Sequence, residues 1–143
     1  MGILNYTTSI DCEKTIGEIQ KCLVKHGATK IITDYADQVP VAVTFSLTMN
    51  GTLIAFTLPA NYEGVLSVMK NDRKIPRNKC TKAQALKVSW RIVKDWTEAQ
   101  CAIVEAKLAD ITEVFLPYAI TANGNTLYKE IQGSGMKMLK SGQ

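Results

Sequence analysis

Histidine is almost missing from this chain of 143 residues, because His26 is its only example. Sites that need several histidines, or catalysis by Ser-His and Cys-His pairs, therefore have one candidate residue. The chain also lacks the motifs G-x-x-x-x-G-K-[ST], G-x-G-x-x-G, H-E-x-x-H and G-x-S-x-G, which mark common enzymes. The sequence therefore predicts a protein that is not an enzyme and has no cofactor.

Cysteine is sparse and scattered along the sequence. The four cysteines form no C-x-x-C pair, which excludes zinc-knuckle and thioredoxin-type motifs: Cys12, Cys22, Cys80 and Cys101. We interpret Cys12, Cys22 and Cys101 as small apolar residues on helix faces, because free cysteine is often buried. No metal site is expected, and reduced thiols suit a cytoplasmic protein.

Long hydrophobic runs are absent as well. No segment approaches the roughly 18 apolar residues of a membrane-spanning helix, and the N-terminus lacks the pattern of a signal peptide. An apolar share of 46% and a charged share of 21% are ordinary for a globular protein. We expect one domain over residues 1–132, followed by a flexible, Gly- and Ser-containing tail over residues 133–143.

The N-terminal part predicts a strand followed by a helix. Residues 3–10, "ILNYTTSI", are rich in β-branched and aromatic types, which favours a strand. Asp11 can then cap a helix that ends at Gly27. Its apolar positions form one stripe: Cys12, Ile16, Ile19 and Leu23.

Three further β-type runs follow at residues 29–35, 39–47 and 52–58. In the middle run, alternate residues share one face of the strand: Val41, Val43, Phe45 and Leu47. Asn50 and Gly51 suit a two-residue type I′ turn, so the last two runs should form a hairpin. Residues 61–71 resemble a short helix that leads into a basic loop interrupted by Pro76.

A long helix is expected after this loop. Thr81 and Gln84 match a capping box, in which the Thr hydroxyl accepts the backbone N–H of the Gln and the Gln side chain reaches back to the backbone N–H of the Thr. No proline or glycine occurs at residues 82–116, so the helix can extend to Pro117, about 52 Å at the usual rise. Its apolar arc is wide, which favours self-association, with a break in the helix as the alternative. The predicted fold is α+β: a small, mostly antiparallel sheet (β-α-β-β-β) packed by an N-terminal helix and a long C-terminal helix.

Positive charge is concentrated in residues 70–94. This stretch holds nine of the 17 basic residues, including all three arginines, against one acid, Asp72. We predict an anion-binding face for nucleic acid, formed by Arg73, Lys74, Arg77, Lys79 and Lys82 on the loop and Lys87, Arg91 and Lys94 on the helix. Two alternatives stay open: a merely solvated face, or an antiparallel dimer in which this basic half of the long helix meets the acidic half of a second copy.

Aromatic and acidic residues add little to the functional prediction. Trp90 and Trp96 each align with an apolar row, which indicates core or dimer packing rather than base stacking. Tyr6, Tyr35 and Phe45 could form a stacking platform only if their sheet face were open, and we expect helices to cover it. Asp34 and Asp37 flank an expected turn and are explained by turn chemistry.

Three segments carry a family resemblance. They are "EKTIGEIQKCLVKHGATKI" (13–31), "FTLPAN" (56–61) and "AQALKVSWRIVKDWTEAQCAIVEAKLADITEVFLPY" (83–118). The sequence resembles a group of small proteins encoded by phages and prophages, mainly of Gram-positive bacteria. The resemblance implies a phage context and supplies no catalytic residues.

Phage context leads to two functional hypotheses. The first is a non-enzymatic accessory protein in the cytoplasm of the infected host cell, which binds DNA or RNA through its basic loop and helix start. The alternative is a counter-defence inhibitor, anti-CRISPR or otherwise anti-immune, that binds a host defence protein or sequesters a nucleotide signal. In both, we expect a homo-oligomer formed through the long helix and no membrane association.

Overall fold

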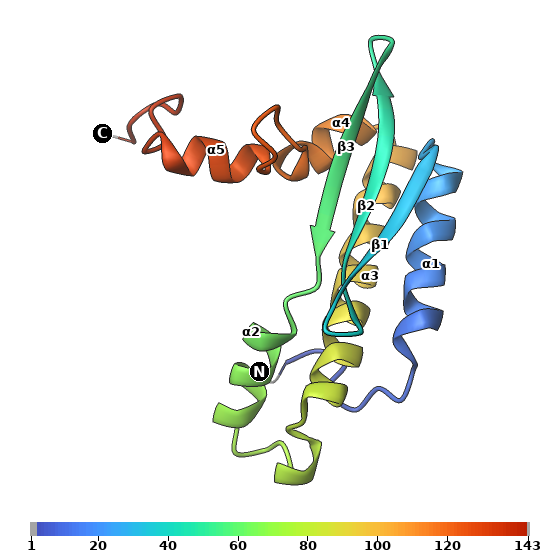
Figure 1. Cartoon of the computed structure of the whole chain (residues 1–143), viewed down its shortest axis with the longest axis vertical. Helices are drawn as coiled ribbons and strands as arrows, with labels where there is room; N and C mark the ends of the chain where they lie inside the picture. The colour runs from blue at the N-terminus through green and yellow to red at the C-terminus, as the bar shows by residue number, and fades with distance from the viewer. Residues whose placement is uncertain (1–2, 143) are drawn as a thin grey trace.

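The computed structural model describes residues 3–142 and forms an elongated α+β structure (Figure 1). Its elements are α1 (Cys12–Lys25), β1 (Lys30–Ala36), β2 (Val39–Met49), β3 (Thr52–Pro59), α2 (Tyr62–Asn71), η1 (Arg77–Lys79), α3 (Lys82–Glu105), α4 (Ile111–Phe115), η2 (Leu116–Tyr118) and α5 (Leu127–Gly133). The three strands form one antiparallel sheet in the order β1-β2-β3. The predicted class, with an N-terminal helix and a long helix packed on a small antiparallel sheet, is confirmed.

The hairpin between β2 and β3 forms as its turn residues predict. Asn50 and Gly51 have φ angles of 50° and 80°, and Met49 pairs with Thr52. Both angles lie in the left-handed region that a type I′ turn requires. This turn therefore fixes the register that places the apolar residues of both strands on the same face.

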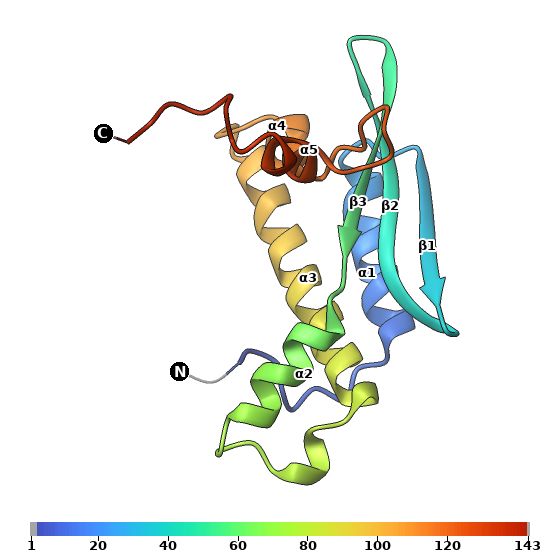
Figure 2. The same cartoon turned by 60° about the vertical axis from the view of Figure 1, so that its left-hand side comes forward.

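The core lies between the sheet and the two helices α1 and α3, which cover one face of it (Figure 2). On β2, Val43, Phe45 and Leu47 are buried, as the alternating pattern predicts. The Phe45 ring stacks on Phe56 at 5.4 Å and meets the edge of Phe115 at 5.2 Å. Such pairs add to the burial of apolar area, so this aromatic cluster fixes the packing of α4 against the sheet.

Helix α3 is shorter than predicted, because it ends at Glu105 and not near Pro117. Lys107 adopts φ 61°, and the N–H groups of Lys107 and Leu108 donate to the carbonyls of Val104 and Ile103. These bonds form a Schellman motif, which ends a helix through one left-handed residue. The motif usually takes glycine, so a lysine there gives no sequence signal, and the alternative of a break in the helix is confirmed.

Helix α4 then restarts the chain in a new direction. Asp110 and Glu113 form a capping box at its start. The turn carries Phe115 back into the core, where it is fully buried. The D-x-x-E spacing is visible in the sequence and was the signal that could have located this restart.

The second apolar side of α3 is covered by α2. Met69 and Ile75 pack there against Ala85 and Val88, with Ile92 at the edge of this second cluster. The wide apolar arc of α3 is therefore explained by packing within one chain. It no longer supports the predicted homo-oligomer, which stays a prediction.

The prediction of a strand at residues 3–10 is wrong. Asn5 has a φ of 66°, which breaks an extended run, and residues 4–7 form turns. The Gln84 side-chain amide donates to the carbonyls of Tyr6 and Thr8 at 2.8 and 2.9 Å. The segment is therefore held along α3 by a side chain rather than by a strand partner.

Two predicted helix caps are only half formed. Thr81 accepts from the Gln84 N–H as expected, at 3.1 Å, but the Gln84 side chain bonds the N-terminal segment instead of reaching back. Asp11 occupies the position before α1 without a side-chain cap bond, and its carboxylate faces Lys87 instead.

Over residues 3–142, no helix combines the length and the apolar character that a membrane span requires.

Candidate nucleic-acid interface

The loop between α2 and α3 forms one end of the elongated molecule (Figure 1). It is anchored by Ile75, which is buried, and by the Cys80 thiol, which lies 3.5 Å from the Met69 carbonyl. The Asp72 carboxylate accepts the Lys74 N–H at 2.9 Å, so the one acid of the loop is engaged with its backbone. These contacts anchor the loop against α2 and the second core cluster.

Five of the eight predicted cations lie on this loop or at its junction with α3, and we call them the tip cations: Arg73, Lys74, Arg77, Lys79 and Lys82. All are exposed except Lys79, which is half-buried. Within residues 3–142, none of the tip cations forms an ion pair with a carboxylate. The Lys82 ammonium lies 5.1 Å from the centre of the Tyr62 ring, a cation–π contact.

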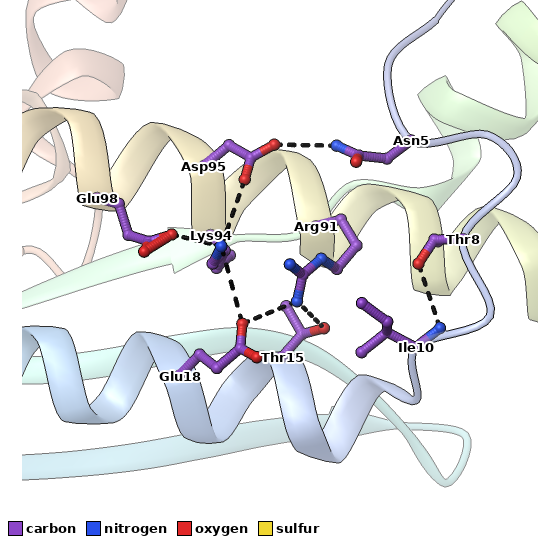
Figure 3. A network of polar contacts seen from close by, with 9 residues as sticks. All are labelled: Asn5, Thr8, Ile10, Thr15, Glu18, Arg91, Lys94, Asp95 and Glu98. Atoms are coloured by element: carbon purple, nitrogen blue, oxygen red, sulfur yellow. Dashed lines mark hydrogen bonds and ion pairs between the residues drawn. The ribbon is translucent and has the colours of Figure 1, made fainter.

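The other three predicted cations have carboxylate partners within the protein, and Figure 3 shows two of them, Arg91 and Lys94. The Arg91 guanidinium lies 2.8 Å from the Glu18 carboxylate and 3.3 Å from the Thr15 hydroxyl. Lys94 contacts Glu18 at 3.9 Å and also the carboxylates of Asp95 and Glu98, while Lys87 lies 3.7 Å from Asp11. Lys87, Arg91 and Lys94 are therefore engaged with carboxylates, whereas the tip cations form no such ion pair within residues 3–142.

The contacts of Lys94 between α1 and α3 favour its protonated form. The hydrogen bond with Glu98 is the main cause that raises the pKa of Lys94 above 10.5. Its side chain is only 17% exposed. A phosphate at Lys94 would have to compete with three carboxylates, so the residue is poorly suited to bind one.

The aromatic residues serve the core, as predicted for the two tryptophans. Trp90 is fully buried and its indole N–H donates to the Pro40 carbonyl at 3.2 Å. Trp96 meets the edges of Phe115 and Tyr118 at 5.7 and 5.4 Å. They are therefore not offered to bases.

The stacking platform does not form either. Phe45 is buried beneath the helices, as expected, and Tyr6 lies outside the sheet. Tyr35 alone of the three is well exposed. Any contact with nucleic acid at the tip therefore depends on charge and hydrogen bonds.

One group of residues escaped the sequence analysis. Cys22, His26 and Cys101 place their side-chain ligand atoms within 4.8 Å of one another, at the far end of α3 from the tip. Burial, and next the hydrogen bond with Cys22, raise the pKa of the Cys101 thiol far above its ordinary value. The interpretation of Cys22 and Cys101 as unrelated apolar residues is therefore incomplete, because they come from different helices that only the fold brings together.

No protein-family model, curated protein or solved structure matches this chain with significant similarity. The resemblance to phage-encoded proteins thus stays a prediction. The candidate site depends on the geometry of this chain alone.

Proposed function

We propose that this protein binds nucleic-acid phosphates through the tip cations, as a non-enzymatic accessory protein of a phage in the cytoplasm of the infected cell. The observation that carries the proposal is the gathering, on one anchored loop and its junction with α3, of five cations that have no carboxylate partner among residues 3–142. Later in α3, Lys87, Arg91 and Lys94 pair with acids of the same chain. Exposed lysines elsewhere, such as Lys14 and Lys21, are also unpaired among the described residues, so the tip is set apart by the clustering of its cations, two arginines included, within residues 73–82.

The chemistry of the tip favours phosphate over other anions. Arg73 and Arg77 can each form two parallel hydrogen bonds to one phosphate, and the lysines add point charges. Because the loop carries no free aromatic platform or base-reading helix, we expect contacts with the backbone and little sequence preference. If all five cations engage, the slope of log K against log salt should be about −3.5 for single strands and −4.5 for duplex DNA.

The test is fluorescence anisotropy with labelled single-stranded and duplex DNA and RNA over a salt series. We compare wild type with the variant Arg73→Gln/Arg77→Gln/Lys79→Gln. The matched control, Lys14→Gln/Lys21→Gln/Lys30→Gln, removes the same charge from exposed lysines elsewhere. The tip variant should flatten the slope by about 2 to 3, because each lost phosphate contact accounts for roughly 0.7–0.9.

The control separates a site from general electrostatics. Equal weakening by both triple variants would mean that only net charge matters and would reject the tip as a site. Absence of binding at low salt in wild type would reject nucleic acid as the ligand altogether.

A second candidate, the counter-defence inhibitor, is favoured by a different observation. An apolar groove lies between η2, α5 and the segment that follows, lined by Leu116, Pro117, Leu127, Tyr128, Ile131, Met136 and Leu139. Exposed apolar surface of this kind suits a protein partner. The groove thus favours the protein-binding form of this hypothesis. If wild type binds no nucleic acid, a thermal-shift screen of nucleotides tests the sequestration form separately, since a ligand of the native state raises Tm; no shift with any nucleotide would leave the protein-binding form.

A further inference from the structure

Helices α1 and α3 lie side by side and parallel, and each presents two metal-ligand types one turn apart. Cys22 lies near the end of α1 and His26 follows four residues later as its C-terminal cap, while Cys101 and Glu105 stand four residues apart on α3. Residues at this spacing lie on the same face of a helix. We propose that these four residues form a zinc-binding site between the two helices.

One of the two hydrogen bonds of His26, the one at Nδ1, has the pattern of a metal ligand. Its Nδ1 lies 2.7 Å from the Cys22 carbonyl, an acceptor, so Nδ1 carries a proton and donates it. Histidine ligands usually donate their second ring N–H to a carbonyl or carboxylate in this way, which fixes the tautomer and aims the other nitrogen at the metal. Nε2 is thus the ligand atom, and it lies 2.9 Å from the Glu105 carboxylate.

The separations suit a tetrahedral ion. With Zn–S near 2.3 Å and Zn–N or Zn–O near 2.0–2.1 Å, ligand atoms around zinc stand roughly 3.3–3.8 Å apart. The two thiols and the imidazole lie within 4.8 Å of one another, and the carboxylate is in hydrogen-bond contact with the imidazole. Small side-chain rotations, with no movement of the helices, would therefore close the site.

The donor set selects the metal class. Two thiolates with one imidazole and one carboxylate favour zinc over magnesium or calcium, which prefer all-oxygen sites. On binding, the two S–H bonds break and the proton that lies between His26 Nε2 and the Glu105 carboxylate is displaced. Bonds from the metal to both sulfurs, Nε2 and the carboxylate form, and the released protons pass to solvent. The resulting net charge of −1 is offset by Lys25, whose ammonium lies 3.6 Å from Glu105.

The site would clamp the C-terminal ends of α1 and α3. Cys101 is 19 residues beyond Lys82, about 28 Å along the helix, so this site is separate from the tip. The ligands come from buried and half-buried positions, with Glu105 at the exposed edge. This arrangement indicates a structural role rather than a catalytic one.

The test uses cobalt(II), which replaces zinc and reports its ligands by absorption. Reduced, metal-free full-length protein is titrated anaerobically with Co²⁺ at mildly alkaline pH, and Zn²⁺ is then added. Wild type should show a thiolate-to-cobalt charge-transfer band and visible Co²⁺ absorption bands whose high intensity indicates four ligands. One equivalent of Zn²⁺ should remove both. Cys22→Ser and Cys101→Ser should weaken binding by more than the roughly 10- to 100-fold that loss of an outer partner causes.

The matched control is Cys80→Ser, which removes a thiol outside the site and should leave the spectrum unchanged. Circular dichroism checks that the serine variants fold. The proposal is overturned if reduced wild type gives no charge-transfer band, or if the band persists at full intensity in Cys22→Ser. It is also overturned if wild type isolates with a Cys22–Cys101 disulfide and, once reduced, takes up no Co²⁺.

Discussion

Replacing Arg91 with alanine should destabilise the protein while leaving nucleic-acid binding intact. Sequence alone places Arg91 with the other arginines in the basic stretch. In the structure its side chain is 13% exposed and bonds Glu18, whose side chain is 34% exposed. The fold therefore assigns this arginine to the α1–α3 interface, and the two assignments lead to opposite outcomes.

The cost follows from the contacts that Arg91→Ala removes. A hydrogen bond to a charged group contributes about 1.5–3 kcal/mol, whereas an exposed ion pair contributes about 0–1 kcal/mol. Arg91 lies between these cases, and Lys94 still neighbours Glu18 after the change, at 3.9 Å. We therefore expect a loss of about 2 kcal/mol, or roughly 6–10 °C in Tm for a chain of this size.

The assay pairs urea unfolding with the anisotropy salt series, and Arg77→Ala is the matched control. Arg77 is exposed on the loop, so its removal should change stability by less than about 0.5 kcal/mol while flattening the salt slope. The reasoning is refuted if Arg91→Ala unfolds like wild type and loses binding, because Arg91 would then belong to the binding surface and not to the interface.

Two further predictions concern α3. Lys107→Gly should raise stability by about 0.5–1 kcal/mol, because glycine adopts the left-handed conformation without the clash of a Cβ. The control Lys107→Ala keeps the Cβ and should give no gain. Thermal unfolding measures both variants, and a gain in both would contradict this account. Because the pKa of Lys94 is raised in the folded protein, its contribution to stability is fully present below 10.5 and is lost as pH rises through the higher folded value. Glu98→Gln removes the carboxylate that chiefly raises the pKa of Lys94. In urea unfolding, wild type should therefore be more stable than this variant at neutral pH, and the difference in stability should shrink above pH 10.5. A difference that does not depend on pH would refute this role for the pair.

Local chemistry explains which parts of the fold could be predicted from sequence. The Asn50–Gly51 turn and the alternation of Val43, Phe45 and Leu47 depend on neighbours in the chain, so they could be inferred. The end of α3 could not, because Lys107 takes a conformation that sequence assigns to glycine. The segment that follows it places Phe115 in the core, where the ring is fully buried.

The same distinction between local and tertiary causes applies to the candidate site. That a basic stretch exists is a property of the sequence, but which of its charges are free depends on what packs against it. The same is true of Cys22 and Cys101, which are far apart in the chain and meet only when α1 lies against α3. Pairings between helices carry no local signal, so every charge and every thiol looks equally available in a single sequence.

The charge order of α3 explains where the free cations lie. This helix is basic at its start and acidic at its end, opposite to what the helix macrodipole favours. Helix α1 runs parallel to it with the complementary order, since Asp11 and Glu18 face Lys87 and Arg91, while Lys25 and His26 face Glu105. A second copy is therefore not needed to explain the two charged halves of α3.

The register of this helix pair also sets the limit of the neutralised surface. Helix α1 begins at Cys12, at the level of Lys87, and α3 and its preceding loop continue beyond that end (Figures 1 and 2). On the loop and α3, the cations that precede Lys87 have no acidic helix beside them, whereas Lys87, Arg91 and Lys94 are paired with carboxylates. The tip cations are free because α1 stops short of them. Extending α1 toward the tip by one acidic turn, with Glu facing Lys82, should therefore weaken phosphate binding without changing any tip residue, and the salt series would measure it.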